Sequence, residues 1–139
     1  ITGGARNDII IGGAGDDTLV EGLGADTFVW NLGDQGEAGA PATDKVMDFT
    51  LGQFGVDGEA DKLDIADLLD GASNANLAEY LHASDDGNGN TVLQISHNGG
   101  FTEGTYDESV VDQTIVLKGV AYNDALIQQM LSNGQLEIE

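Results

Sequence analysis

The chain has 139 residues, of which 25 are acidic and only 4 are basic, so its formal net charge is −21 at neutral pH. A surface so acidic excludes nucleic acid as a partner and disfavours insertion into or binding to anionic membranes, because like charges repel. Cysteine is absent, so disulfides cannot stabilise the fold, and no apolar run approaches the roughly 18 residues of a membrane-spanning helix. A solvated acidic surface, an adaptation to high salt and a requirement for bound cations would all produce this composition.

Residues 3–29 form three nine-residue units in unbroken register. An apolar residue recurs at the eighth position and glycine is frequent in the first four, with Arg6 and Glu21 as departures. The sixth position is always aspartate: Asp8, Asp17 and Asp26. Glycines allow the positive φ angles of a sharp turn, and calcium takes about six to eight oxygen ligands, which carbonyls and carboxylates supply. Each unit is therefore predicted to be a calcium-binding turn followed by a short strand.

This Gly-Gly-x-Gly-x-Asp-x-apolar-x pattern resembles the calcium-binding nonapeptide repeat of RTX proteins. A chance Gly/Asp-rich loop is a poor explanation, because both the aspartate and the apolar position are kept in every unit. A phosphate-binding loop is equally poor, because two aspartates and no lysine follow Gly15. The resemblance implies several Ca²⁺ ions as cofactors and a parallel β-roll in which successive strands lie in opposite sheets.

Turns two units apart are then expected to stack on the same side of the roll. In RTX proteins each turn supplies half of a site through alternate carbonyls and the sixth-position aspartate. Carried over to this chain, the first and third units frame one whole site. Its ligands are Gly3, Ala5 and Asp8 from one turn, facing Gly22, Gly24 and Asp26 from the other.

The second unit has a less certain partner in this scheme. It would supply a half-site of Gly12, Ala14 and Asp17. The next turn, residues 30–35, retains only Gly33 and Asp34 of the motif. The partner is therefore either that degraded turn or a repeat upstream, and replacing Asp17 is expected to reduce calcium affinity less than replacing Asp8 or Asp26.

The region after the repeats is predicted to contain short strands and helices. A stretch of small residues ending at Pro41, the only proline, predicts a loop. Residues 44–49 alternate as a strand with Val46 inside, and residues 61–65 repeat this alternation before a short helix at 66–69.

Four aspartates in these segments are candidate ligands of a further calcium site: Asp44, Asp48, Asp61 and Asp64. Asp44 and Asp48 are expected on the face of their strand opposite Val46. Solvent-facing charges paired with Lys45 and Lys62 fit the same pattern, so both interpretations stay open. Residues 57–59 are predicted to be a turn.

The predicted elements of the C-terminal half are a helical turn or two at 75–81, strands at 91–96 and 114–120, a helix at 124–131 and a final strand at 135–139. Asn123 is a suitable cap for the helix, and Gly134 is a suitable terminator. Residues 86–90 resemble the start of an EF-hand loop, but Thr91 stands where that loop requires glycine. We therefore interpret them as a polar turn between strands.

The sequence offers no argument for catalysis. His82 and His97 are the only histidines, they do not form His-Glu-x-x-His, and no cysteine exists to complete a zinc site. No serine lies in Gly-x-Ser-x-Gly. We expect this chain not to be an enzyme.

An ordered series of segments is similar to the C-terminal target domain of type I secretion substrates. They are residues 24–30, 44–49, 61–69, 90–93, 114–120 and 131–136. This family ends large RTX adhesins and some RTX toxins and hydrolases of Gram-negative bacteria. The resemblance implies an uncleaved C-terminal export signal, recognised by an ABC transporter, an adaptor and an outer-membrane channel.

These observations predict an all-β fold, with a short right-handed calcium-binding parallel β-roll over residues 1–29. An antiparallel β module with one to three short helices, residues 30–139, would cap it within one continuous domain.

The expected function is that of a secreted or cell-surface calcium-binding region that folds on export, carries the secretion signal and joins upstream adhesin repeats, with a role in adhesion and biofilms. Two alternatives are a non-catalytic module of a secreted protease, lipase or toxin, and an adhesive ligand-binding domain. The chain begins within a repeat and shows no signal peptide, so a piece of a longer protein is expected.

Overall fold

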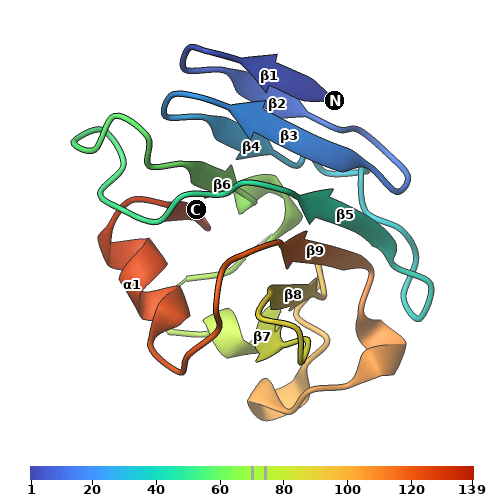
Figure 1. The fold of residues 1–139 in the computed structure, drawn as a ribbon. Helices are drawn as coiled ribbons and strands as arrows, with labels where there is room; N and C mark the ends of the chain where they lie inside the picture. The colour runs from blue at the N-terminus through green and yellow to red at the C-terminus, as the bar shows by residue number, and fades with distance from the viewer. Residues whose placement is uncertain (70, 74) are drawn as a thin grey trace.

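Successive nonapeptide strands alternate between two facing sheets in the computed structural model, which describes residues 1–69, 71–73 and 75–139 (Figure 1). The first sheet begins with β1 (Thr2–Gly4) and β3 (Thr18–Gly22), and the second with β2 (Ile9–Ile11) and β4 (Thr27–Val29). Both pairs are parallel, with an offset of 18 residues. Turns two units apart therefore stack, and the predicted parallel β-roll is confirmed.

The parallel stack continues beyond the nonapeptides. β5 (Ala42–Val46) pairs with β3, and β6 (Lys62–Asp64) pairs with β4. β9 (Gln113–Leu117) then pairs with β5, and β10 (Leu136–Glu137) pairs with β6. The offsets grow to 27 residues between β3 and β5 and to 35 between β4 and β6, so longer loops separate these later coils.

An antiparallel hairpin extends the first sheet past β9 (Figure 1). β7 (Leu81–Asp85) pairs with β8 (Thr91–Ile95), and β8 pairs with β9. Strands occur at both predicted places, 91–96 and 114–120, but β9 ends at Leu117, three residues earlier than predicted. The end of the helical segment predicted at 75–81 belongs to β7. Between β7 and β8, the Asp86 carboxylate accepts hydrogen bonds from the amides of Asn88 and Asn90, which closes the predicted polar turn.

Helical structure in the described residues is short. The 3₁₀ turns are η1 (Ala66–Leu68), η2 (Leu77–Glu79), η3 (Thr102–Gly104) and η4 (Glu108–Val110). The α-helix α1 (Leu126–Ser132) begins two residues later than predicted, after the Asn123 side chain accepts a hydrogen bond from the Ala125 amide. Gly134 follows the helix with a φ of 73°, a left-handed conformation that suits a residue without a side chain.

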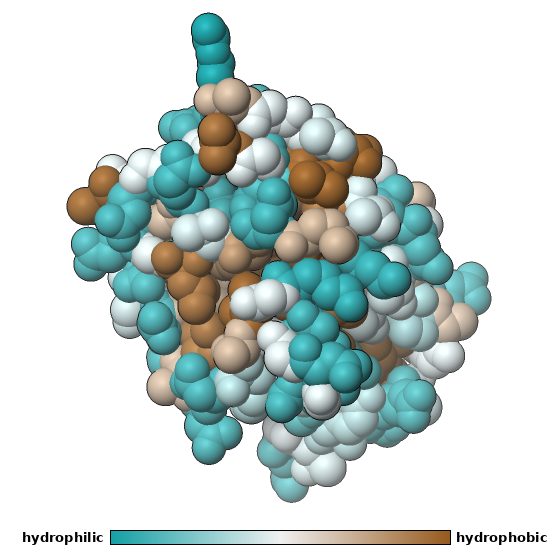
Figure 2. All heavy atoms as spheres, viewed as in Figure 1, coloured by the Kyte–Doolittle hydropathy of each residue, from teal (hydrophilic) through white to brown (hydrophobic). Residues whose placement is uncertain are grey.

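The space between the two sheets is filled by the apolar residues that occupy the eighth position of each repeat and by their successors in later strands. These buried side chains are Ile10, Leu19, Phe28, Val46, Leu63 and Leu117. The same core continues into the cap, where Leu126 and Met130 of α1 are fully buried. On the face shown in Figure 2, hydrophilic residues predominate and the hydrophobic ones lie in separate groups. The core therefore fixes the positions of the turns at the edges of the sheets.

Candidate calcium sites

Stacking of the coils places the turn aspartates one above another in two columns. The Asp8 column consists of Asp8, Asp26 and Asp61, which directly precede β2, β4 and β6. The Asp17 column consists of Asp17, which directly precedes β3, and Asp44, which lies within β5. Two of these five aspartates, Asp44 and Asp61, come from outside the nonapeptides.

The same hydrogen bond closes every gap between neighbouring aspartates of a column. The amide of Asp8 donates to Oδ1 of Asp26 at 2.6 Å, and the amide of Asp26 donates to Oδ1 of Asp61 at 2.9 Å. The amide of Asp17 donates to Oδ1 of Asp44 at 2.7 Å. Each downstream carboxylate thus uses one oxygen to hold the coil above it, which leaves the second oxygen for another partner.

Two carboxylate oxygens of the columns are buried without a partner among the described residues. Oδ2 of Asp17 and Oδ2 of Asp26 accept no hydrogen bond from the described residues, and the Asp26 side chain is inaccessible to solvent. An unpaired buried carboxylate oxygen is strongly unfavourable, because it has lost its hydration and gained nothing in exchange. A bound cation would remove this penalty.

Glycines allow the stacked turns to touch. Gly22 has a φ of 95°, and a Cβ built on it would lie 2.0 Å from the carbonyl oxygen of Gly4. Gly24 has a φ of 113°, and its built Cβ would lie 2.7 Å from the carbonyl carbon of Arg6. Side chains at either position would push the coils apart, so glycine is required here for both conformation and space.

The turns also present unused carbonyl oxygens. Those of Ala5, Ala14 and Gly24 accept no hydrogen bond within the described part of the chain. Gly3 and Gly12 lie close to the aspartate of their own unit, with built Cβ positions 2.9 Å from Oδ2 of Asp8 and 2.7 Å from Oδ2 of Asp17. Free carbonyls beside carboxylates are the hard oxygen ligands that calcium prefers. Whether these oxygens bind an ion stays a prediction.

The structure corrects the partner expected for Asp17. Residues 30–35 do not stack on the second unit; Asp34 instead closes its own turn by accepting a hydrogen bond from the Asn31 amide. β5 pairs with β3, which brings Asp44 onto Asp17, and the Thr43 amide donates to Asp16. The expectation that Asp17 lacks an intact partner is therefore wrong, because a longer loop carries the chain past residues 30–35 before the next coil begins.

The positions expected for Asp44 and Asp48 are also wrong in part. Asp44 and Val46 are both buried, because residues two apart in a strand point to the same face. Trp30 Nε1 and Gln113 Nε2 donate to Oδ2 of Asp44 at 2.7 and 2.9 Å, so this carboxylate is no solvent-facing charge. Asp48 lies past the end of β5 and accepts hydrogen bonds from the amides of the third nonapeptide turn.

Asp64 lies apart from both columns. It sits in β6 opposite Glu137 of β10, where Lys62 and Glu137 form an ion pair at 3.3 Å. Burial, together with the charge of Glu137, raises the pKa of Asp64. The structure therefore does not bring Asp64 together with the other predicted ligands.

Glu21 is a buried acidic residue that the sequence marked only as a departure from the repeat. Ligand oxygens of Glu21, Asp26 and Asp61 lie within 4.8 Å of one another, and all three residues are buried. Burial, reinforced by the neighbouring Asp61, raises the pKa of Glu21 to about 10. Burial likewise raises the pKa values of Asp26, Asp44 and Asp61. A carboxylate in a position normally given to glycine was the sequence signal for this cluster.

Residues 52–57 repeat the geometry of a nonapeptide turn, whereas the sequence predicted a turn only from Asp57 onwards, at residues 57–59. The Gln53 amide donates to Oδ2 of Asp57 at 2.8 Å, just as the Gly4 amide donates to Oδ2 of Asp8 at 2.7 Å. Gly55 has a φ of 86° at the fourth position. The glycines of this turn and the aspartate at its sixth position were visible in the sequence, although the segment is isolated from the tandem repeats.

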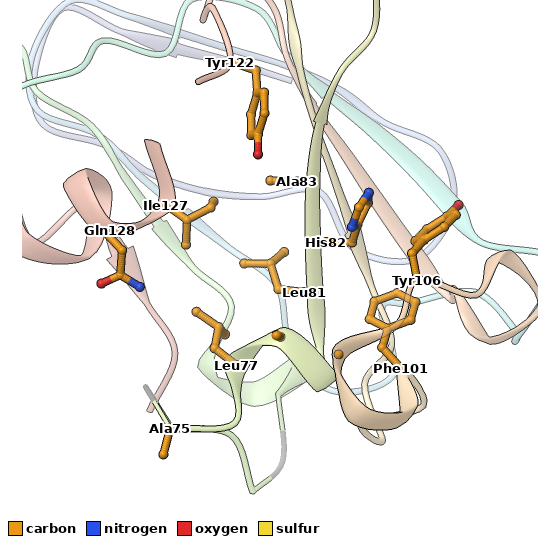
Figure 3. A pocket seen from close by; sticks show the side chains of 12 residues that line it. Ala75, Leu77, Leu81, His82, Ala83, Phe101, Tyr106, Tyr122, Ile127 and Gln128 are labelled. Carbon is orange, nitrogen blue, oxygen red and sulfur yellow. The ribbon is translucent and has the colours of Figure 1, made fainter. Parts of the chain in front are cut away.

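A separate cavity lies in the cap, away from the carboxylates (Figure 3). Its volume is about 390 Å³. It is lined by Leu81, His82, Tyr106, Tyr122 and Ile127, among others, so its walls are mainly aromatic and aliphatic. His82 and Tyr106 pack with ring centroids 4.4 Å apart.

Comparisons with known proteins agree with this geometry. Residues 1–28 match the family model described as RTX calcium-binding nonapeptide repeat (4 copies). This segment carries RTX calcium-binding repeats. No curated protein matches the chain.

Among solved structures, the solution structure of the AlgE6R2 subunit from the Azotobacter vinelandii mannuronan C5-epimerase is similar to this RTX-containing chain. The sequence identity is 28%, the TM-score is 0.59, and the alignment covers 98% of this chain and 79% of that one. The likeness thus extends well past the RTX repeats into the cap. Within the part of this chain that the structure describes, no helix is both long and apolar enough to cross a membrane.

Proposed function

We propose that this chain is a calcium-dependent folding module of an exported protein. It stays unfolded where calcium is scarce and folds where calcium is plentiful. The observation that carries the proposal is the pair of aspartate columns, in which buried carboxylate oxygens of Asp17 and Asp26 have no partner among the residues that the structure describes. The RTX repeats in residues 1–28 support the choice of calcium.

The magnitudes suit a switch between two calcium concentrations. Extracellular calcium modules have dissociation constants of about 10⁻⁴ to 10⁻³ M, so at a few millimolar calcium each site adds about 1–2 kcal/mol. Three gaps in the two columns would together add about 3–6 kcal/mol, which is a large share of the roughly 5–15 kcal/mol of a typical domain. At micromolar calcium this contribution vanishes.

Circular dichroism in chelator and in calcium tests this function. We expect a weak β signal in chelator and a cooperative return of the β signal as calcium rises into the millimolar range. A chelated protein with the same spectrum and melting temperature as the calcium-loaded protein would contradict the proposal.

The C-terminal segment is proposed to act as the type I secretion signal, recognised by an ABC transporter, an adaptor and an outer-membrane channel. In the folded chain β9 pairs with β5, and β10 forms the edge of the second sheet by pairing with β6. Folding therefore ties both strands into the sheets, whereas a calcium-free chain leaves them accessible to a transporter. This mutual exclusion supports folding after export rather than before it.

An export assay tests the secretion role. A passenger fused to the chain is expressed in cells with a matching type I system, and the passenger in the medium is quantified. Deletion of residues 123–139 should abolish export, whereas replacement of Asp8 and Asp26 should slow export or folding without preventing recognition. Normal export of the deletion, with loss of export for the aspartate variant, would contradict the assignment.

Two kinds of parent protein fit such a module. A large surface adhesin that acts in cell adhesion and biofilms, joined through its upstream adhesive repeats, is our first candidate. A secreted enzyme to which this chain adds a non-catalytic module is the second, and it is favoured by the likeness to a repeat subunit of an epimerase. The coding sequence upstream of Ile1 distinguishes them, since it would encode either tandem adhesive repeats or a catalytic domain.

A ligand-binding role is supported by one feature, the aromatic cavity in the cap (Figure 3). Screening the calcium-loaded chain against a glycan array tests it. Binding that is lost on replacement of Tyr106 or Tyr122 by alanine would favour this role, and an array without signal would contradict it.

A further inference from the structure

We propose that Glu21, Asp26 and Asp61, with Asp48 and Glu59 beside them, bind one divalent cation of calcium size at the junction between the repeats and the following loop. We call this group of five carboxylates the junction site. The proposal rests on the calcium-dependent function given above. It adds a site that the nonapeptide pattern does not contain, because three of its carboxylates lie outside the repeats and the fourth replaces a glycine.

The centre of the junction site is compact and dry. One carboxylate oxygen from each of Glu21, Asp26 and Asp61 lies within 4.8 Å of the other two. Glu21 is 2% exposed and Asp26 is 0% exposed, and Oε2 of Glu21 and Oδ2 of Asp26 have no hydrogen-bond partner among the described residues. A compact cluster of three buried carboxylates, two of which carry a buried oxygen without a partner in the described part of the chain, is an arrangement that a cation would complete.

The following loop brings two more carboxylates to the same turn. Asp48 accepts hydrogen bonds from the amides of Glu21 at 3.0 Å and Gly22 at 3.3 Å. Glu59 accepts one from the amide of Gly24 at 3.0 Å. Both side chains are exposed, so they can move from the amides towards an ion at little expense in packing. The third turn is thus held between its own carboxylates and those of the loop.

Within the described residues, no salt bridge includes a member of the junction site. The contacts between basic and acidic side chains found there are Lys62 with Glu137 and His97 with Asp112. Clustered carboxylates without a counter-charge must either take up protons or bind cations. At neutral pH and millimolar calcium, a cation is the available alternative.

The donor set selects the kind of cation. Every candidate ligand is oxygen, so zinc, which prefers nitrogen and sulfur, is disfavoured. Calcium accepts irregular arrangements of about six to eight oxygens, including bidentate carboxylates. Magnesium requires a tighter octahedron and gives up its water reluctantly, so it fits a crowded group of carboxylates poorly.

Binding here would connect two parts of the chain. Glu21 and Asp26 belong to the last nonapeptide, whereas Asp48, Glu59 and Asp61 flank or lie within the loop that leads from β5 to β6. An ion shared between them would hold that loop against the roll. The junction site therefore makes the order of residues 48–61 depend on calcium.

Calorimetric calcium titration of Glu21→Gln and Glu59→Gln tests the proposal, with Glu108→Gln, an exposed acid in the cap, as the charge-matched control. Glu21→Gln should lose one bound calcium or weaken one site by at least about tenfold. Glu59→Gln, whose exposed side chain makes misfolding improbable, should weaken the same site by at least about threefold. Glu108→Gln should bind like the original chain.

Hydrogen exchange provides the structural measurement. Calcium should protect the amides of residues 48–61 in the original chain and in Glu108→Gln, but much less in Glu21→Gln. Unchanged calcium number and affinity in both site variants, or equal protection of the loop in Glu21→Gln, would overturn the junction site. An original chain that binds no calcium would instead refute the proposed function.

Discussion

The pairing of Asp17 with Asp44 makes Asp17 a sensitive test of the column arrangement. We expect Asp17→Asn to remove calcium-dependent stability without weakening the calcium-free protein. The substitution keeps the shape of the side chain and removes its charge. Oδ2 of Asp17 has no hydrogen-bond partner in the described parts of the chain. The hydrogen bond in this gap runs from the Asp17 backbone amide to Asp44, so the substitution leaves it in place.

The expected magnitude follows from the loss of one inter-turn site. With about 5 mM calcium and a dissociation constant of about 10⁻⁴ to 10⁻³ M, one site contributes about 1–2 kcal/mol. For a domain of this size, 1 kcal/mol shifts the melting temperature by about 3–5 °C. Asp17→Asn should therefore melt about 3–10 °C lower than the original chain in calcium, and no lower than it in chelator.

Thermal unfolding followed by circular dichroism, with and without calcium, provides the measurement. Asp8→Asn is the comparison within the repeats, and Asp124→Asn, an exposed aspartate with no hydrogen bond to its carboxylate among the described residues, is the control. Equal losses with and without calcium would show a purely structural role for the Asp17 carboxylate. A loss for Asp8→Asn but none for Asp17→Asn would show that the Asp17 column holds no ion.

Three other perturbations follow from the same geometry. Without calcium, burial raises the pKa of Glu21 from 4.5 to about 10, so folding takes up a proton at any pH between these values. Acidification from about pH 8 to about pH 5.5 in chelator should therefore increase the folded fraction measured by circular dichroism. A folded fraction that does not change with pH would contradict this. Gly22→Ala places a Cβ 2.0 Å from the Gly4 carbonyl oxygen, so it should lower the free energy of unfolding of the calcium-loaded chain by about 3 kcal/mol or more, measured by urea unfolding. Gly15→Ala is the control, because a Cβ there meets no atom within 4 Å, and it should lower the free energy of unfolding by only about 1 kcal/mol through backbone strain. Magnesium at the same concentration as calcium should restore little of the β signal, and equal restoration would argue against sites of calcium size.

The nonapeptide coils could be predicted from the sequence because every structural requirement recurs at a fixed spacing. An apolar residue two positions after each aspartate specifies an inward side chain, as at Ile10 and Phe28, and the constant unit length specifies which turns stack. The observed offset of 18 residues between β2 and β4 follows directly from that repetition. Local chemistry and long-range pairing agree here, so one pattern predicts both.

The coils beyond residue 29 could not be predicted in the same way, because the loops before β5 and β6 change the spacing. Periodicity predicts that residues 44–46 form a strand. It cannot predict that this strand pairs with β3 at an offset of 27 residues instead of 18. The expectation that Asp17 pairs either with residues 30–35 or with a repeat upstream failed for this reason.

The strand β7 shows the opposite failure, in which local preference was misleading. The segment from Leu77 to Leu81 contains good helix formers, and the structure does place a 3₁₀ turn at its start. From Leu81 onwards, however, pairing with Ile95 of β8 determines the conformation. Long-range hydrogen bonds override helix propensity where the sheet needs another strand.

The ends of the columns show how the roll can stop without leaving an unpaired charge. The register of β9 on β5 places Ile115 where a further aspartate would follow Asp44, and the Gln113 side chain donates to Asp44 instead. On the other side, Gln135 Nε2 donates to the carbonyl oxygen of Asp61 at 2.9 Å, next to β10. Both glutamines are fully buried. A neutral amide thus replaces the next carboxylate at each end, so the demand for cations ends with the last aspartate of each column and the cap can pack as an ordinary apolar core.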